Sequence, residues 1–138
     1  MPNINELEIG LEVVSEVYHL TRDSLVRYAG ASGDFNPIHY RDDIAQSVGL
    51  PGVLAHGMLT MGVSIAPVLS WIGDPAKVVD YGVRFTKPVL VPASGSAELR
   101  VSAKIGQIDQ ENSRVRVDIT TEFEGNTVLG KSQAWVQL

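Results

Sequence analysis

Twenty consecutive residues in the middle of the chain, Val53 to Ile72, contain no Asp, Glu, Lys or Arg. Such a run can form either a helix that crosses a bilayer or a helix that is buried in a protein core. This run also contains His56 and Pro67, and no basic residue flanks it closely. We therefore predict a core helix that begins near Gly57 and ends near Ile72.

The residues after this run alternate between apolar and polar side chains, which is typical of strands that bury one face. Between residues 97 and 105, the apolar set is Ala97, Leu99, Val101, Ala103 and Ile105, and the polar set is Glu98, Arg100, Ser102 and Lys104. Residues 113–123 repeat the pattern, and Gly125-Asn126 is a two-residue hairpin turn into residues 128–138. With a further candidate at residues 78–85, we predict four strands in hairpin-like series.

The N-terminal third combines one strand with two short helices. Residues 9–17 are the candidate strand. Thr21 is a helix N-cap, and its helix would end near Gly30–Gly33. A second short helix would run from Arg41 to Val48 and be closed by Gly49.

This order of elements predicts an α+β fold in which an antiparallel sheet of about five strands wraps round the central helix. We expect residues 1–138 to form a single domain, because the chain contains no repeat, low-complexity segment or linker. An open sheet of this size leaves strand edges and apolar surface uncovered. We therefore expect a homodimer.

Composition excludes several classes of function. A net charge of −5 disfavours a nucleic-acid surface, and the lack of cysteine excludes disulfides and thiolate metal sites. The sequence has no P-loop and no Gly-x-Gly-x-x-Gly pattern, so we expect no cofactor. The first ten residues have no basic run followed by an apolar stretch, so a cytoplasmic protein is expected.

Asp34 and His39 lie five positions apart in the stretch GDFNPIH. A turn on a polar loop is one interpretation, because Asp and Asn beside Gly and Pro favour turns. The alternative is an acid/base pair that acts on one water molecule, held rigid by Gly33 and Pro37. Spacing alone leaves both interpretations open.

Two further residues follow this stretch, at the start of the apolar run. His56 would complete a two-histidine, one-carboxylate metal set with Asp34 and His39. We instead expect the His56 ring to bond the backbone and hold the turn into the long helix, with no metal. The backbone N–H of Gly57 would be free at the helix N-terminus, where it either stabilises an oxyanion or simply starts the helix.

Taken together, these motifs resemble the MaoC-like, (R)-specific enoyl hydratase/dehydratase family. The family motif D-x-N-P-x-H is matched by Asp34, Asn36, Pro37 and His39, and its second block by residues 55–58, AHGM. Residues 81–92 resemble the strand that follows the family's helix. Within the family, the chain is most similar to the catalytic β-type subunits of actinobacterial (3R)-hydroxyacyl-ACP dehydratases.

The resemblance implies a hot-dog fold whose units pair edge to edge. It also implies reversible hydration of a trans-2-enoyl thioester to the (3R)-3-hydroxyacyl thioester. Asp34 and His39 would share the catalytic water, the Gly57 amide would bind the thioester carbonyl oxygen, and Asn36 would hold the motif loop.

The resemblance leaves several features of the activity open. The acyl chain would occupy a tunnel between subunits, closed by side chains such as Val68, Leu69 or Trp71. A serine that some short relatives carry in the helix is replaced here by Ile65, with Ser64 beside it. The carrier is either coenzyme A or acyl carrier protein (ACP), and Arg84, Lys87, Arg100 and Lys104 could contact it. A hot-dog thioesterase and a non-catalytic subunit of a heterodimer are the alternatives.

Overall fold

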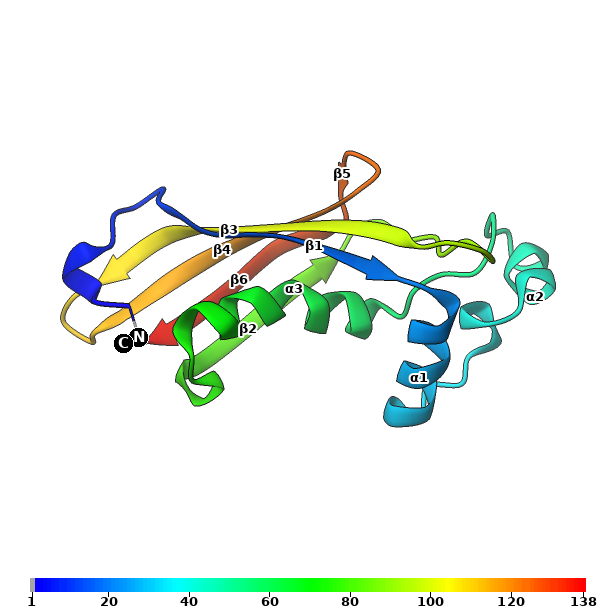
Figure 1. The fold of residues 1–138 in the computed structure, drawn as a ribbon, viewed down its shortest axis with the longest axis horizontal. Helices are drawn as coiled ribbons and strands as arrows, with labels where there is room; N and C mark the ends of the chain where they lie inside the picture. Colours follow the sequence, from blue (N-terminus) through cyan, green and yellow to red (C-terminus); the bar gives the residue numbers. More distant parts are fainter. Residues whose placement is uncertain (1) are drawn as a thin grey trace.

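A computed structural model describes residues 2–138 and contains one antiparallel sheet and three α-helices within that range. Figure 1 shows that α3 lies against one face of the sheet, while α1 and α2 gather at the end of the sheet where α3 begins. In chain order, the main elements are β1 (Glu12–Leu20), α1 (Arg22–Ser32), α2 (Asp42–Ser47), α3 (Gly57–Ile72), β2 (Val78–Phe85), β3 (Ala97–Asp109), β4 (Arg114–Phe123), β5 (Asn126–Thr127) and β6 (Leu129–Gln137). Short 3-10 turns at Ile4–Glu6 (η1), Pro37–His39 (η2) and Pro75–Lys77 (η3) complete the set.

The predicted antiparallel sheet is confirmed, with one short addition and two corrections. The last hairpin turn is Glu124-Gly125 (φ 49° and 75°) and not Gly125-Asn126, because Asn126 belongs to β5 and pairs with Phe123. The four C-terminal strands are not a simple hairpin series, because β2 pairs with β6 and not with β3.

The strands of the sheet run in the order β1-β3-β4-β6-β2, and the two-residue β5 pairs with β4 outside this path. The alternating apolar positions of β3 are all buried, as their period of two predicted. Val101, Ala103 and Ile105 belong to the larger core cluster, which also contains Val68, Ile72 and Val117. Ala97 and Leu99 belong to the smaller one.

The long helix has the predicted bounds. It runs from Gly57 to Ile72 and is closed by Gly73 in the left-handed conformation, at φ 76°. Pro67 lies inside the helix and is buried, although proline supplies no N–H to the helical hydrogen-bond ladder. No helix among residues 2–138 combines the length and the apolar character that crossing a membrane requires.

The first strand differs from its predicted position. We expected residues 9–17, but β1 covers Glu12–Leu20 because Gly10 turns the chain at φ 90° before the strand begins. The Gly10 N–H donates to the carbonyl of Ile105, and the Ile105 N–H donates to that of Leu11. Backbone hydrogen bonds to β3 thus begin at the turn itself, and the regular strand follows from Glu12.

The helices beyond β1 follow their predicted signals. The Thr21 hydroxyl accepts the Ser24 N–H, and the Ser24 hydroxyl accepts the Thr21 N–H, which together cap α1. The helix ends at Gly33, whose φ of 77° is left-handed. The second short helix is one residue shorter at each end than the expected range, since Arg41 and Val48 are its caps.

Candidate active site

Asp34 and His39 lie on the link between α1 and α2, which is folded by its own side chains. The Asp34 carboxylate accepts the N–H of Asn36 at 3.1 Å, and the Asn36 side chain accepts the N–H of Ile38 at 3.2 Å. Pro37 then starts the 3-10 turn that contains His39. These successive Asx turns hold the link in a single shape.

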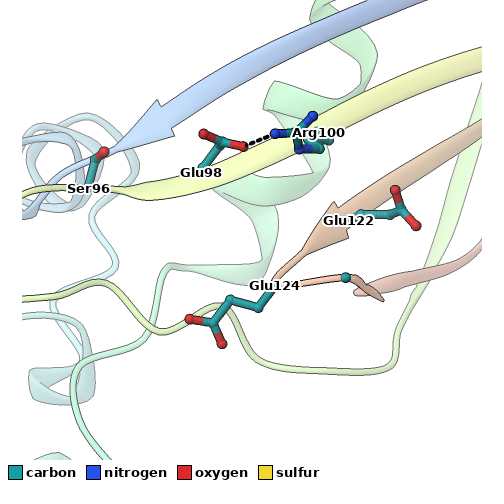
Figure 2. Close-up of a pocket in the computed structure, with 6 residues that line it drawn as sticks. Ser96, Glu98, Arg100, Glu122 and Glu124 are labelled. Atoms are coloured by element: carbon teal, nitrogen blue, oxygen red, sulfur yellow. Dashed lines mark ion pairs between the residues drawn. The ribbon is translucent and has the colours of Figure 1, made fainter.

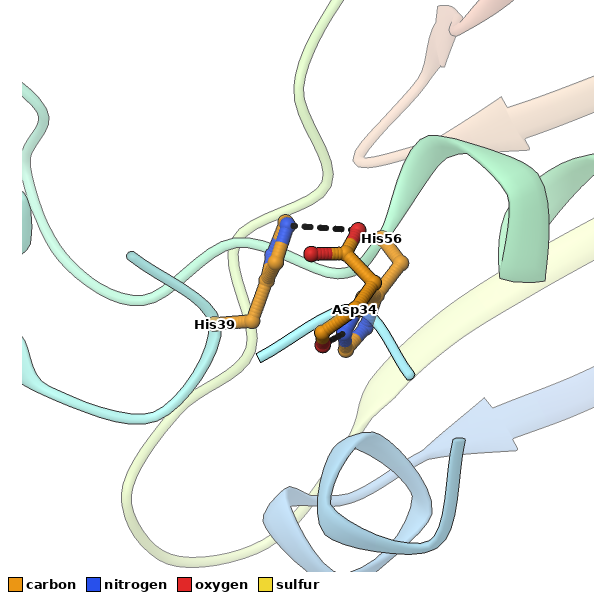
Figure 3. A group of neighbouring side chains, drawn as sticks. All are labelled: Asp34, His39 and His56. Atoms are coloured by element: carbon orange, nitrogen blue, oxygen red, sulfur yellow. Dashed lines mark hydrogen bonds and ion pairs between the residues drawn. The ribbon is translucent and has the colours of Figure 1, made fainter. Parts of the chain in front are cut away.

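The link brings the two expected side chains together (Figure 3). His39 Nε2 lies 3.9 Å from Asp34 Oδ2, with 51% of the Asp34 side chain and 10% of the His39 side chain exposed. This distance exceeds that of a hydrogen bond, yet one water molecule could contact both groups. The Asp34 carboxylate is thus open to solvent, whereas the His39 imidazole is largely buried.

Leu54 determines which nitrogen of His39 carries the proton. His39 Nδ1 lies 2.8 Å from the Leu54 carbonyl oxygen. Because a carbonyl oxygen only accepts hydrogen bonds, Nδ1 must be the donor. The neutral ring then presents the Nε2 lone pair toward Asp34, where it can accept a proton.

His56 supports the pair from beneath. Its ring stacks on that of His39 with centroids 3.8 Å apart, and the edge of Tyr28 packs against it at 4.7 Å. Its Nε2 lies 3.2 Å from the backbone carbonyl oxygen of Asp34, to which it donates. Burial lowers the pKa of His56 below its usual value, and the neighbouring His39 also lowers it. The hydrogen bond to Asp34 raises the pKa, but by less than burial lowers it. The ring is therefore a neutral spacer at physiological pH.

The same three side chains fit a metal ion poorly. One potential ligand atom from each of Asp34, His39 and His56 lies within 4.8 Å of the others. However, the two imidazole planes are only 22° apart and stacked, so their in-plane lone pairs run side by side and do not converge. Each ring bonds a backbone carbonyl oxygen through one nitrogen, and the remaining nitrogen of His56, Nδ1, is buried. The donor set thus lacks the convergent geometry of a two-histidine, one-carboxylate site.

Gly57 is the first residue of α3, next to His56. Among the residues that the structure describes, none accepts a hydrogen bond from the Gly57 N–H. A Cβ at this position would lie 3.0 Å from Cε1 of Phe85. Two exposed apolar side chains, Met58 and Phe85, therefore adjoin a helix terminus whose first amide is unpaired.

Comparison with known proteins agrees with this arrangement. The family model described as "MaoC like domain" matches residues 6–123. The chain belongs to the MaoC-like dehydratase family.

Relatives of this MaoC-like chain include longer proteins. It is 42% identical over 78 residues to 3-hydroxyacyl-thioester dehydratase X of Mycobacterium tuberculosis, which covers 56% of this chain and only 27% of the relative. A solved MaoC-like dehydratase superposes with a TM-score of 0.96 at 36% identity, covering 99% of this chain and 42% of that one. The fold is also shared by the (R)-hydratase of A. caviae, with a TM-score of 0.84, 18% identity and coverage of 96% and 98%. The chain thus spans less than half the length of the first two.

The long helix of this MaoC-like chain offers no free hydroxyl near its centre. Ser64 is fully buried, donates to the Thr60 carbonyl oxygen at 2.7 Å and accepts from the Thr121 hydroxyl at 2.7 Å. Ile65 packs in the core. Of the expected tunnel residues, Val68 is fully buried, and Trp71 lines a surface cavity of about 340 Å³. A tunnel between subunits remains an expectation.

Arg100 lies in a separate cavity on the outer side of the sheet (Figure 2). It pairs with Glu98 at 2.8 Å. The cavity, of about 360 Å³, is lined by Ser96, Glu98, Arg100, Glu122, Glu124 and Gly125. Three carboxylates against one guanidinium repel a phosphate, so the surroundings of Arg100 are unsuited to an anionic carrier.

Sequence reasoning missed several contributors to the site. Leu54 contributes its backbone carbonyl oxygen, and a sequence motif, which specifies side chains, does not identify such a contact. Tyr28 and Phe85 reach the site from α1 and from the end of β2. Their approach depends on tertiary structure.

Proposed function

We propose that this chain catalyses the reversible addition of water to a trans-2-enoyl thioester, which gives the (3R)-3-hydroxyacyl thioester. The observation that carries the proposal is the 3.9 Å approach of His39 Nε2 to Asp34 Oδ2, with the opposite nitrogen of His39 engaged by Leu54. Membership of the MaoC-like family and the relative named 3-hydroxyacyl-thioester dehydratase X support the reaction class.

In the hydration direction, Asp34 and His39 hold one water molecule between them. The water oxygen bonds to C3 of the substrate while the pair accepts a proton from it. The pair then returns that proton to C2, so that one water is added and the enzyme is regenerated. Each such proton transfer by a positioned side chain typically contributes about 10²–10⁴-fold to the rate.

Gly57 has a separate role in the proposal. Its unpaired N–H, at the positive end of the α3 dipole, would bind the thioester carbonyl oxygen as negative charge develops there. Asn36 and Pro37 would maintain the shape of the link, and His56 would support the His39 ring.

The substrate carrier in this proposal is coenzyme A or acyl carrier protein, and the setting is fatty-acid metabolism. Support for the setting comes from relatives named fatty acid synthase subunit beta and enoyl-CoA hydratase 2. We further propose a homodimer, because β1 and β2 are edge strands of the sheet that expose Val17 and Val79.

The test is the loss of enoyl-thioester absorbance when the purified chain is mixed with crotonyl-CoA or a long-chain enoyl thioester. Hydration bleaches the absorbance without releasing thiol. Release of free thiol would instead identify a thioesterase. A chain that does neither, alone or as an assembled homodimer, would contradict the proposal and favour a structural subunit.

A further inference from the structure

Arg22 and Asp42 form an ion pair between the first residues of α1 and α2, the two helices that flank the Asp34–His39 link. Arg22 Nη1 donates to Asp42 Oδ2 at 3.1 Å, and Nη2 donates to Oδ1 at 2.9 Å. The Arg22 side chain is only 24% exposed. Such bidentate, partly buried pairs have a defined geometry, unlike most surface ion pairs.

The pair also holds two other segments of the chain. Arg22 Nε donates to the Val91 carbonyl oxygen at 2.8 Å, and Asp42 Oδ1 accepts the Val53 N–H at 3.3 Å. Residues 53–55 and 89–91 are in turn joined to each other, since the Val91 N–H donates to the Val53 carbonyl and the Ala55 N–H to that of Val89. The pair therefore ties both helix starts to a short backbone ribbon.

This ribbon carries the carbonyl that orients the candidate base. The Leu54 N–H donates to the Ile38 carbonyl oxygen at 3.1 Å, and the Leu54 carbonyl oxygen accepts from His39 Nδ1 at 2.8 Å. Leu54 is one residue from Val53, whose amide Asp42 holds. Any shift of residues 53–55 would therefore move the acceptor of the His39 proton.

We propose that Arg22 and Asp42 are positioning residues for the hydration step. They hold residues 53–55 so that the Leu54 carbonyl keeps the proton of His39 on Nδ1 and leaves the Nε2 lone pair facing Asp34. Neither residue contacts the reacting atoms. The inference rests on the proposed function for its effect on rate, but its effect on the His39 tautomer does not depend on that function.

The chain offers a matched control for the test. Asp43 is the next residue of α2 and pairs with Arg41, but both side chains are more than half exposed. The variants Asp42→Ala and Asp43→Ala each remove one carboxylate from the first turn of the same helix. Only the first of them removes the contacts to Arg22 and Val53.

Two readouts are compared in the purified full chain. We expect Asp42→Ala to lower kcat for crotonyl-CoA by about tenfold or more with KM within about twofold, because misplacing a catalytic group affects the transition state more than substrate binding. Asp43→Ala should leave both constants unchanged. Asp42→Asn, which keeps an oxygen acceptor, should recover part of the lost kcat.

The second readout is the ¹⁵N spectrum of the His39 ring at about pH 8.5, where imidazoles are largely neutral. The resonances are assigned by their loss in His39→Ala. Wild type and Asp43→Ala should show the proton on Nδ1, and Asp42→Ala should show a mixture of tautomers. If Asp42→Ala fails to fold, Arg22→Lys takes its place. This variant keeps the positive charge but cannot form the bidentate contact of the guanidinium.

A folded Asp42→Ala or Arg22→Lys with wild-type kcat and the Nδ1–H tautomer would overturn the inference, as would a wild-type ring protonated on Nε2. If the wild-type chain hydrates no enoyl thioester, the proposed function fails. The tautomer comparison still decides the positioning role in that case, since a shift in Asp42→Ala supports it and an unchanged tautomer overturns it.

Discussion

At the scale of single residues, the proposed mechanism separates the groups that would transfer protons from the groups that support them. Asp34 and His39 present a carboxylate oxygen and a ring nitrogen to the same space, while His56 and Leu54 hold the imidazole from its face and from its far nitrogen. The supporting contacts involve a neutral ring and a backbone carbonyl. They fix geometry without placing a competing charge beside the reacting groups.

Replacing either member of the pair should remove most of the activity. We expect Asp34→Asn and His39→Ala each to lower kcat by at least about 100-fold, because each group takes part in proton transfer in the transition state. The double variant should lose much less than the product of the two losses, since both act on one water. Hydration rates and circular dichroism are measured together. Near-normal turnover in a folded single variant would refute the assignment.

Gly57 can be tested through its backbone. Gly57→Pro removes the N–H, and His56 already has the extended backbone (ψ 131°) that a residue before proline prefers. Gly57→Ala keeps the N–H and places a similar Cβ against the exposed Phe85 ring, which can move aside. We expect the proline variant to turn over crotonyl-CoA at least about tenfold more slowly than the alanine variant. Equal rates would mean that Gly57 only starts the helix.

His56 should make folding stability depend on pH. Burial lowers its pKa in the folded state, so the unfolded chain takes up this proton first as pH falls. The free energy of unfolding should therefore be fully retained above about pH 6.5 and decrease below it. Urea unfolding between about pH 5 and 8 should show that the free energy of unfolding falls less steeply with decreasing pH for His56→Gln than for wild type. Parallel declines would show that His56 titrates alike in both states.

At the scale of elements, a glycine in β3 makes room for an ion pair on β4. A Cβ at Gly106 would lie within van der Waals overlap of the Asp118 carboxylate, at 2.1 Å from Oδ2. That carboxylate pairs with Arg116 at 2.7 Å. The Asp118 carboxylate can thus occupy this position only because residue 106 has no side chain.

We expect Gly106→Ala to displace Asp118 and lower the free energy of unfolding by about 1 kcal/mol, the scale of a favourable exposed pair. The same change should cost less in an Asp118→Ala background, because the two sites are in contact. Gly82→Ala in β2 is the control, since nothing lies within 4 Å of its added Cβ. Chemical denaturation of the four variants completes the comparison. An equal cost in both backgrounds would exclude this coupling.

The elements also show what could be predicted from sequence. The bounds of α3 follow from local information, namely one glycine inside the uncharged run, where the helix starts, and another directly after it. The displacement of β1 does not, because hydrogen bonds between Gly10, Leu11 and Ile105 decide where pairing begins. For the site, the sequence identified Asp34 and His39 but not their backbone partner. The Arg22–Asp42 pair joins positions whose proximity depends on the packing of two helices.

At the scale of the whole molecule, the sheet ends in two edge strands, each of which has a strand neighbour on one side only. β1 and β2 form its edges and expose Val17 and Val79, at 45% and 56%. Among residues 2–138, neither strand has a neighbour on its outer side, so a second copy could extend the sheet from either edge (Figure 1). Exposed edges of this kind favour pairing with another chain.

We expect light scattering to give about twice the chain mass of 14.9 kDa. A lysine on an edge strand opposes pairing, so one of Val17→Lys and Val79→Lys should yield monomers and the other should not. A stable monomer with full activity would contradict the dimer. An inactive monomer that gains activity with a related subunit would indicate a heterodimer.

Asp34 and His39 lie on one six-residue stretch outside both apolar core clusters. If the proposed roles hold, two substitutions there would abolish the reaction without altering a strand or the long helix. After duplication of a gene for such a chain, one copy could become inert in two steps and still assemble with its active sibling. The residues that form the fold and the residues of the proposed reaction can thus change independently in this protein.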